Sequence, residues 1–335
     1  MKALSKMTFP ESDWVVEGLL RTARKRPSLL VGKPETGKST LARQLAVCVS
    51  QGRRFLGRET KRGSVLYRQT EDQVQDVIAS GIRLGYQPEQ DEQIYVFQGD
   101  PDSSGCEDIA DLLDKDRSVK LVLLETLDDL LRISDVKENS AAREAFDKFN
   151  TQLMSKFADT TVFLALHHLK KAANEFAGDA ILGASVMRGR TDAKIFLQQA
   201  APDDERRVIH TSKRIGTAIP KTYLLFDPTT GRSELGETVA EAAHTAKTAD
   251  RKLAEEKLFN ILLSRPNIEH SDLVDALDGK QMRTLRLIHD HVASGLIVSS
   301  GRGVKGSPRT YRMAAVPMDT RGMVEVPTEG TNASL

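Results

Sequence analysis

The sequence predicts an α/β fold, in which a largely parallel sheet covered by helices on both faces is followed by a smaller C-terminal domain. Short apolar runs alternate with segments of helical period between residues 28 and 166. Continuous apolar strands separated by helices are typical of parallel sheets that are buried on both faces. A glycine-rich loop at residues 32–37 joins the first strand to the first helix. From residue 236 onward the pattern changes to three helical segments and two short extended runs.

Five strands are predicted for the parallel part of the sheet, and a helix follows each of the first four. The strands are expected at residues 28–31, 64–68, 93–97, 120–125 and 161–166. The helices are expected at 38–50, around Val74, Val77, Ile78 and Ile82, near 107–113, and around Ala142, Phe146, Phe149, Leu153 and Phe157. The apolar residues of the second and fourth helices recur at helical spacing and predict one buried face for each. Three further runs, "AKIFLQQ", "RVIHTSK" and "KTYLLFD", have no helices between them and predict an antiparallel extension.

The C-terminal part of the chain predicts a winged helix-turn-helix. Its helical segments are "LAEEKLFNILLSRP", "HSDLVDAL" and "KQMRTLRLIHDHVASG", and two extended runs flank the glycine-rich turn "GRGVKGSP". We expect a first domain at residues 1–235, a small and polar linker at 236–250, the winged helix at 251–313 and a disordered tail at 314–335.

Composition limits the class of protein without naming its partner. A length of 335 residues suggests two domains, and the formal net charge of +1 means that any nucleic-acid surface must be local. Cys48 and Cys106 have no metal-ligand spacing, which fits a reducing compartment. The N-terminus has no apolar signal core, and no apolar run is long enough to span a membrane. We therefore expect a cytoplasmic protein without a membrane partner.

The loop between the first strand and the first helix fits the phosphate-binding pattern G-x-x-x-x-G-K-[ST]. Lys38 would reach the β- and γ-phosphates, and the Ser39 hydroxyl would hold Mg²⁺. The start of the helix adds its positive dipole end. The sequence therefore predicts ATP and Mg²⁺ as cofactors. The predicted nucleotide-binding residues are Gly32, Lys33, Pro34, Glu35, Thr36, Gly37, Lys38, Ser39 and Thr40.

Three strands end in polar side chains that suit catalysis. Glu71 follows the second strand and could act as general base, or it could only favour the start of the next helix. Glu125 ends the fourth strand, and we expect it to bind Mg²⁺ with Ser39, although it could act as a base or be a solvated acid at a helix start. His168 ends the fifth strand and could sense the γ-phosphate, with His167 as the second choice and a structural role as the alternative.

At these residues the sequence resembles RecA-like hexameric ATPases, and most of all the RepA-type replicative helicases of plasmids and related ATPases of phages and mobile elements. The resemblance covers roughly residues 12–227 and rests on "GKPETGKSTLARQLA", "GSVLYRQTED", "LVLLETLDDL", "FLALHHLKK" and "HTSKRIG". It implies a RecA-like P-loop NTPase core with sheet order 5-1-4-3-2 and a hexameric ring with ATP at the subunit interfaces. It also implies that Lys213 and Arg214 reach the γ-phosphate of the neighbouring subunit.

Two departures from the family pattern bear on the rate of hydrolysis. Glu125 stands where most such ATPases carry Asp, and Leu182 stands at the arginine of the family's "RGSS" segment. Arg188 and Arg190 lie close in sequence and could substitute for that arginine. A slow ATPase, or one used as a switch, therefore stays open.

DNA is the predicted partner, at two different places. The resemblance implies a central channel, for which Lys170 and Lys171 are the nearest cations after the fifth strand. The C-terminal domain gives independent support. Residues 280–312 contain seven cations and a single acid, Asp290, for a net charge of +6. The cations are Lys280, Arg283, Arg286, Arg302, Lys305, Arg309 and Arg312. They fall on the third helix and the wing, which such domains place against DNA, although a basic protein-docking face is the alternative.

The sequence thus predicts an ATP-hydrolysing ring that acts on DNA, as a replicative helicase of a plasmid, a phage or an integrated mobile element. An ATP-switched DNA-binding regulator or non-motor ATPase is the second hypothesis. A protein-remodelling ATPase that is indifferent to nucleic acid is the third.

Overall fold

The computed structural model describes residues 13–23, 25–99, 105–126, 144, 146–168, 190–201, 204–213, 216–277 and 281–314. The chain divides into two compact units, Met1–Ala242 and Ala243–Leu335.

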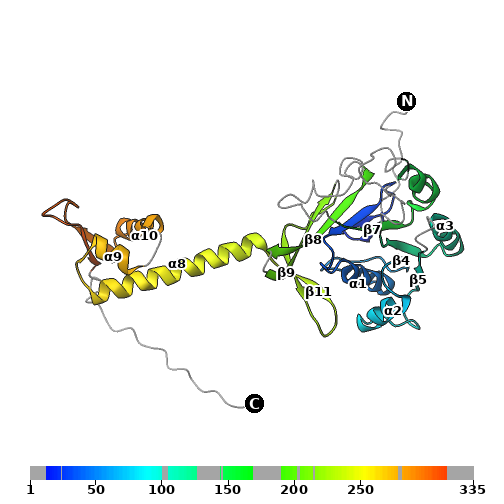
Figure 1. Ribbon diagram of the computed structural model, residues 1–335, viewed down its shortest axis with the longest axis horizontal. Helices are drawn as coiled ribbons and strands as arrows, with labels where there is room; N and C mark the ends of the chain where they lie inside the picture. Colours follow the sequence, from blue (N-terminus) through cyan, green and yellow to red (C-terminus); the bar gives the residue numbers. More distant parts are fainter. Residues whose placement is uncertain are drawn as a thin grey trace, which may run out of the picture. The chain divides into compact units, whose positions relative to one another are not determined.

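A nine-stranded sheet forms the centre of the first unit (Figure 1). Its order is β11-β10-β9-β8-β3-β7-β6-β4-β5. The six strands from β8 to β5 are parallel to one another, and β9, β10 and β11 continue the sheet in antiparallel pairs. The strands are β3 (Ser28–Gly32), β4 (Ser64–Gln69), β5 (Ile94–Gln98), β6 (Val119–Leu124), β7 (Val162–His168), β8 (Ala193–Ala201), β9 (Asp204–Lys213), β10 (Thr222–Phe226) and β11 (Ser233–Thr238). A separate two-stranded pair, β1 (Trp14–Val16) and β2 (Leu20–Arg21), precedes them.

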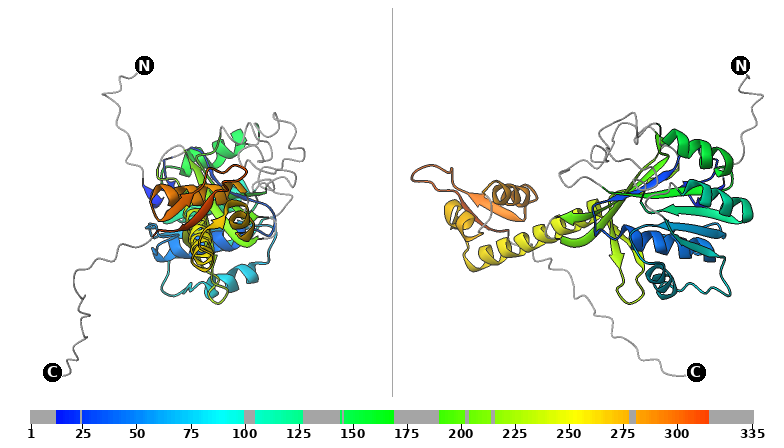
Figure 2. Two further views of the ribbon diagram at one scale, coloured as in Figure 1. Left: turned by 90° about the vertical axis from the view of Figure 1, so that its left-hand side faces the viewer. Right: turned by 45° about the vertical axis from the view of Figure 1, so that its right-hand side comes forward.

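Helices cover both faces of this sheet, as the continuous apolar strands predict. Alternate residues of a strand point to opposite faces, so Leu30 joins one buried cluster and Val31 the other. The helices α1 (Lys38–Gln51) and α2 (Val74–Arg83) contribute to the first cluster. The helix α3 (Cys106–Lys115) and the segment around η2 (Asn150–Met154) and α6 (Ser155–Phe157) contribute to the second. Figure 2 shows α1, in blue, and the helical segment around residues 146–157, in green, on opposite sides of the sheet.

Counted in chain order as the five expected strands, the observed order is 1-5-4-2-3, because β7 lies between β3 and β6, and β4 lies between β6 and β5. The implied core order 5-1-4-3-2 is found when the parallel strands are counted as β3, β4, β6, β7 and β8. The difference is β5, the strand expected at 93–97, which is an additional strand beyond β4. Burial explains the difference at the edge. Every residue of β4 is buried, whereas β5 is only partly buried and forms the edge of the sheet. The apolar run of the second strand therefore belongs to the interior of the sheet rather than to its edge.

The antiparallel extension also begins later than predicted. The run "AKIFLQQ" forms β8, which pairs in parallel with β3, so the antiparallel part starts at β9. The strand β11 is additional to the three predicted runs, and it crosses the predicted end of the first domain at residue 235.

The predicted buried face of α2 is only partly correct. Val77 is buried, but the side chains of Ile78 and Ile82 are 47% and 56% exposed. In the fourth predicted helix, Phe146, Phe149, Leu153 and Phe157 are all buried, as expected, and Ala142 lies outside the described residues.

The second unit contains helices and a three-stranded antiparallel sheet around a small apolar core. Helix α8 (Val239–Ser264) is followed by β12 (Ile268–Glu269), α9 (His270–Ala276), α10 (Gln281–Ala293), β13 (Ile297–Ser300) and β14 (Thr310–Met313). The sheet order is β12-β14-β13, and β12 is a strand that the sequence did not predict. The core consists of Leu258, Leu262, Ile268, Leu273, Leu287, Ile288, Ile297 and Tyr311.

The predicted linker is not an irregular segment. Residues 236–238 end β11, and residues 239–250 form the first half of α8, which crosses the boundary between the two units. Small residues such as alanine favour a helix as much as they suit a linker, which explains the error. The predicted boundary at residue 235 falls inside β11. Residues 315–335 of the predicted tail lie outside the described part of the chain.

Candidate functional site

The glycine-rich loop joins β3 to α1, as predicted. Glycine is required at its two glycine positions for different structural reasons. Gly37 has φ 90°, a left-handed conformation that favours glycine. A Cβ added at Gly32 would lie 2.5 Å from the Leu197 carbonyl oxygen of the adjacent β8. The Thr36 hydroxyl donates to the Lys33 carbonyl at 2.8 Å and closes the turn. Glu35 is exposed, with φ 63°.

Lys38, the first residue of α1, is held inside the loop. Its amine donates to the Lys33 carbonyl at 2.8 Å, and the residue is only 5% exposed. Burial lowers the pKa of this amine, while the nearby charges of Glu71 and Glu125 raise it. The lysine predicted to reach the phosphates and the two predicted acids therefore lie within electrostatic range of one another.

Glu125 follows the end of β6 and is 2% exposed. The Ser39 hydroxyl donates to its Oε1, and the Tyr67 hydroxyl donates to its Oε2 at 2.5 Å. Burial and the adjacent Glu125 carboxylate raise the pKa of Tyr67 well above its ordinary value, so its hydroxyl keeps the proton that it donates. The Thr70 hydroxyl donates to the Glu125 carbonyl at 3.0 Å. Both carboxylate oxygens are thus positioned by hydroxyl groups.

Tyr67 is a site residue that the sequence analysis missed. It lies in the apolar run of β4 and is fully buried, so it resembles a core residue. One signal in the sequence could have identified Tyr67 as a site residue. It carries a hydroxyl group and lies four residues before Glu71, in the strand that leads to this acid. Only the pairing of β4 with β6 brings it beside Glu125.

Glu71 and His168 meet at the same edge of the sheet. Glu71 Oε1 lies 3.3 Å from His168 Nε2, although Glu71 follows β4 and His168 ends β7. The parallel register of β3 and β7 pairs His168 with Gly32, at the start of the phosphate loop. His167 is fully buried, so His168 is the histidine that reaches this edge.

Asp72 has a structural contact of its own. It forms an ion pair with Arg43 of α1, and α2 begins after Gln73 without a side-chain cap. Arg43 also acts on Tyr67 through a hydrogen bond that lowers the tyrosine pKa, against the larger effects of burial and Glu125. A chain of polar contacts therefore runs from Asp72 through Arg43 and Tyr67 to Glu125.

Lys213 and Arg214 were predicted to reach the γ-phosphate of the neighbouring subunit, and the structure describes them only in part. Lys213 ends β9, where it pairs with Ala193 of β8, but its side chain is not described. Arg214 lies outside the described residues. Arg190, one of the two candidates to replace the missing arginine at Leu182, forms an ion pair with Asp147. Leu182 and Arg188 lie outside the described residues.

The predicted DNA-binding residues of the second unit are exposed where the structure describes them. Arg286 lies on α10, and Arg302, Lys305 and Arg309 lie between β13 and β14. The side chain of Arg283 is not described, and Lys170, Lys171 and Lys280 lie outside the described residues.

The oxygen atoms beside the phosphate loop suit a magnesium ion. Carboxylate and hydroxyl oxygens are ligands of Mg²⁺, which is bound by one or two carboxylates together with phosphates and water. Ser39 and Glu125 offer such a pair at the start of α1. Among the described residues there is no cluster of three or more His, Cys, Asp or Glu that could form a metal site of another kind.

The fold and this loop define a P-loop nucleotide-binding domain. A family model described as an AAA domain matches residues 2–174, more than half of the 335 residues, and the chain therefore belongs to this family. Membership of this family indicates that the protein is an ATPase that binds nucleotide. Comparison with curated proteins gives no match. In the part of the chain that the structure describes, none of the helices has the length and apolar character required to cross a bilayer.

Proposed function

We propose that the protein is a Mg²⁺-dependent RecA-like ATPase that acts on DNA. The convergence of Lys38, Ser39, Glu71 and Glu125 at one edge of the parallel sheet carries the proposal. Ligands of open α/β sheets bind outside the carboxyl ends of the strands, which is where these residues lie. Bound Mg²⁺ would supply positive charge to the β- and γ-phosphates of ATP.

Each residue at this edge has a distinct role in the proposal. The Lys38 amine compensates the charge of the β- and γ-phosphates. Ser39 and Glu125 hold the metal ion, and Tyr67 fixes the orientation of the Glu125 carboxylate. Glu71 accepts the proton of the attacking water, and His168 donates to the γ-phosphate and couples its presence to the position of Glu71 at 3.3 Å.

The second unit supports DNA as the partner. Its order of helix, strand, helix, helix, strand and strand fits the proposal of a winged helix, in which α10 would be the recognition helix and the β13–β14 hairpin the wing. Four cations are exposed on these two elements: Arg286, Arg302, Lys305 and Arg309. None of them forms an ion pair with another described residue. Exposed guanidinium and ammonium groups without acids beside them are available to phosphates.

Within this class, we propose a hexameric replicative helicase of a plasmid, phage or mobile element, in which Lys213 and Arg214 act on the γ-phosphate of the neighbouring subunit. The second candidate is an ATP-switched DNA-binding regulator. It is favoured by one observation, that the exposed cations described above belong to the second unit, whereas the residues of the nucleotide site belong to the first.

One experiment separates these functions. ATP turnover is measured with and without single-stranded DNA, together with the mass of the oligomer in solution. Turnover stimulated by single strands, in a hexamer that displaces a paired strand, supports the helicase. Duplex binding without strand displacement supports the regulator, and turnover indifferent to nucleic acid contradicts both.

Substitution of Tyr67 by phenylalanine tests the position of Glu125. Tyr67→Phe removes the hydroxyl that donates to Glu125 Oε2 and leaves the ring in the core. Partners of metal ligands typically contribute about 10-fold to 100-fold to metal affinity or activity. We expect the Mg²⁺ concentration for half-maximal turnover to rise by about tenfold. Tyr95→Phe is the matched control, because it removes a hydroxyl that donates to Asp116 at 3.0 Å, away from the loop. An unchanged Mg²⁺ requirement would exclude this role for Tyr67.

Substitution of Arg302 and Lys305 by alanine tests the wing. If both contact phosphates, the slope of log affinity against log salt for duplex DNA becomes less steep by about 2. Lys247 and Lys252, exposed on α8, give a control double variant with the same loss of charge. Point substitutions are preferable to truncation at residue 244, because α8 is continuous through that position. Equal slopes for the two double variants would show that the wing does not bind phosphates.

A further inference from the structure

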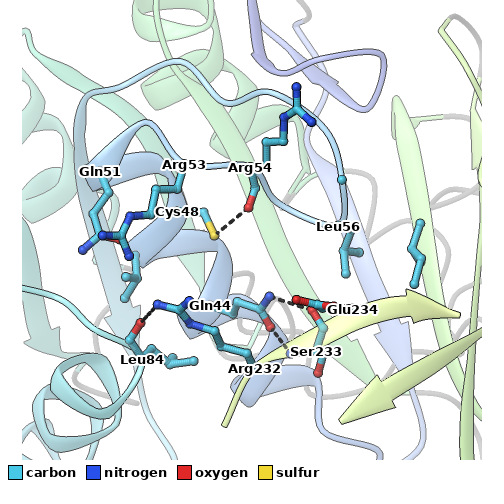
Figure 3. Close-up of a pocket in the computed structure, with 13 residues that line it drawn as sticks. Gln44, Cys48, Gln51, Arg53, Arg54, Leu56, Leu84, Arg232, Ser233 and Glu234 are labelled. Carbon is cyan, nitrogen blue, oxygen red and sulfur yellow. Dashed lines mark hydrogen bonds between the residues drawn. The ribbon is translucent and has the colours of Figure 1, made fainter. Parts of the chain in front are cut away.

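A cavity lies at the opposite end of α1 from the phosphate loop. Its volume is 440 Å³, within the range of roughly 300–1,000 Å³ typical of small-molecule sites. It is lined by the second half of α1, the loop that follows it, the end of α2 and the start of β11 (Figure 3). Cys48 lines the cavity, and at 1.5 Å per helical residue it lies about 15 Å along α1 from Lys38. The cavity is therefore separate from the nucleotide site.

Two guanidinium groups lie close together in this cavity. Arg232 Nη2 and Arg53 Nη1 lie 3.0 Å and 3.9 Å from the point that a Cβ on Gly85 would occupy. Figure 3 shows both groups on the side of the pocket where Gln51 and Leu84 lie. Two positive charges so close to the same point repel each other, and an anion bound between them offsets this repulsion.

Neither guanidinium has a carboxylate partner among the described residues. Arg232 donates to the Leu84 carbonyl at 2.8 Å, and Arg53 has no side-chain hydrogen bond in that set. A third arginine at the cavity, Arg54, differs, because its Nε donates to Glu59 at 2.6 Å. Glu234 also lines the cavity but is exposed and pairs with neither group. Arg53 and Arg232 are therefore available to an anionic ligand.

The remaining lining is largely neutral. Burial raises the pKa of the Cys48 thiol to about 11, although the charges of Arg232 and Arg53 act in the opposite direction, so the sulfur is a neutral thiol near pH 7. Four apolar side chains also line the cavity and form an apolar wall: Val47, Leu56, Leu84 and Leu235. Such a cavity suits a ligand with an anionic group at one end and an organic body at the other.

We propose that this cavity binds a small phosphorylated organic molecule, with its phosphate between Arg53 and Arg232 and its organic body against the apolar wall. Guanidinium groups bind phosphate oxygens in a planar, two-point geometry, which gives both strength and orientation. The site is distinct from the one proposed for ATP, and its ligand contacts the far end of the helix that begins at the phosphate loop.

Calorimetric titration of the full chain with phenyl phosphate tests the proposal. A saturating non-hydrolysable ATP analogue with Mg²⁺ fills the phosphate loop, and the Lys38→Ala variant provides a second way to exclude that loop. We expect phenyl phosphate to bind in both cases, and at least about tenfold more tightly than inorganic phosphate, because burial of one phenyl ring contributes more than about 1.4 kcal/mol. Equal affinity for the two probes would contradict the role of the apolar wall. Loss of binding on filling the loop would place the ligand there and overturn the proposal.

Arginine substitutions locate the binding site. Arg53→Gln and Arg232→Gln are each expected to weaken phenyl phosphate binding by at least about tenfold, because each removes a charge-assisted contact to phosphate. Arg54→Gln is the matched control, since Arg54 lines the same cavity but is already paired with Glu59, and it should change the affinity by less than about twofold. Arg53→Gln breaks no hydrogen bond among the described residues, so its melting temperature should match that of the unsubstituted protein. Binding unchanged by Arg53→Gln would refute the site.

Alkylation of Cys48 gives an independent readout. Iodoacetamide reacts with the thiolate, which forms to a small extent at pH 9 because the pKa of Cys48 is about 11. Cys106, the other cysteine, is buried and serves as an internal reference. Phenyl phosphate in the cavity should slow alkylation of Cys48 in the unsubstituted protein and not in Arg53→Gln. No slowing at a saturating concentration would show that the ligand binds elsewhere.

Discussion

Replacement of Lys38 by alanine is expected to abolish ATP turnover. The Lys38 amine is held in the loop by the Lys33 carbonyl at 2.8 Å and is the first side chain of α1. In the proposed function it provides the positive charge beside the transferring phosphoryl group. Removal of a single group that stabilises transition-state charge typically costs about 10²-fold to 10³-fold in rate, and here the ground-state phosphates lose the same charge. Steady-state turnover and binding of a fluorescent ATP analogue should therefore both decrease.

The Lys38 result depends on an intact fold. Lys38 is buried, and its loss leaves Glu71 and Glu125 without the cation that acts on both of them. The melting temperature and circular dichroism of Lys38→Ala should therefore be compared with those of Lys115→Ala, which removes an exposed lysine at the end of α3. Turnover within a few-fold of the unsubstituted protein would remove the phosphate-loop assignment.

Replacement of Glu71 by glutamine is expected to separate nucleotide binding from hydrolysis. Glutamine has nearly the same shape and can still contact His168, which lies 3.3 Å from Glu71. An amide cannot accept the proton of the attacking water, and loss of a general base typically costs about 10²-fold to 10⁴-fold in rate. Affinity for the ATP analogue should change by less than a few-fold, while single-turnover hydrolysis decreases by the larger factor.

The control for Glu71→Gln is Glu89→Gln, which neutralises an exposed acid beyond the end of α2. Its hydrolysis rate should equal that of the unsubstituted protein. If Glu71→Gln instead loses nucleotide binding, and its bound fraction hydrolyses ATP at the normal rate, Glu71 is a structural acid and the base must be sought elsewhere. Glu125 is then the next candidate, because its carboxylate lies beside Ser39.

The features that the sequence predicts well are those whose cause is local. The phosphate loop is defined by a strand, two glycines and a helix start within about a dozen positions, and β3 and α1 follow this pattern. Apolar runs likewise identify β4, β6 and β7, because a strand buried on both faces is mostly apolar. The polar residues at the ends of these strands then meet at one edge, as parallel strands require.

The errors arise where the deciding contact is not local. The segment 239–250 has small and polar residues that suit a linker, but it forms part of a 26-residue helix whose later turns are fixed by the apolar core of the second unit. Ile78 and Ile82 have helical spacing, yet the part of α2 that faces the sheet is Val77. Spacing specifies a possible face, and the neighbouring elements decide how much of it is covered.

The sequence by itself determined the phosphate loop, the existence of most strands and helices, and the acids and histidine that end the parallel strands. The tertiary structure alone decided the order of the strands, the hydrogen bond from Tyr67 to Glu125, and the approach of Arg53 to Arg232. The physical reason is that hydrophobic period and turn chemistry act over a few residues. The order of strands and the contacts between distant side chains instead depend on which segments share a buried surface. No short stretch of sequence contains that information.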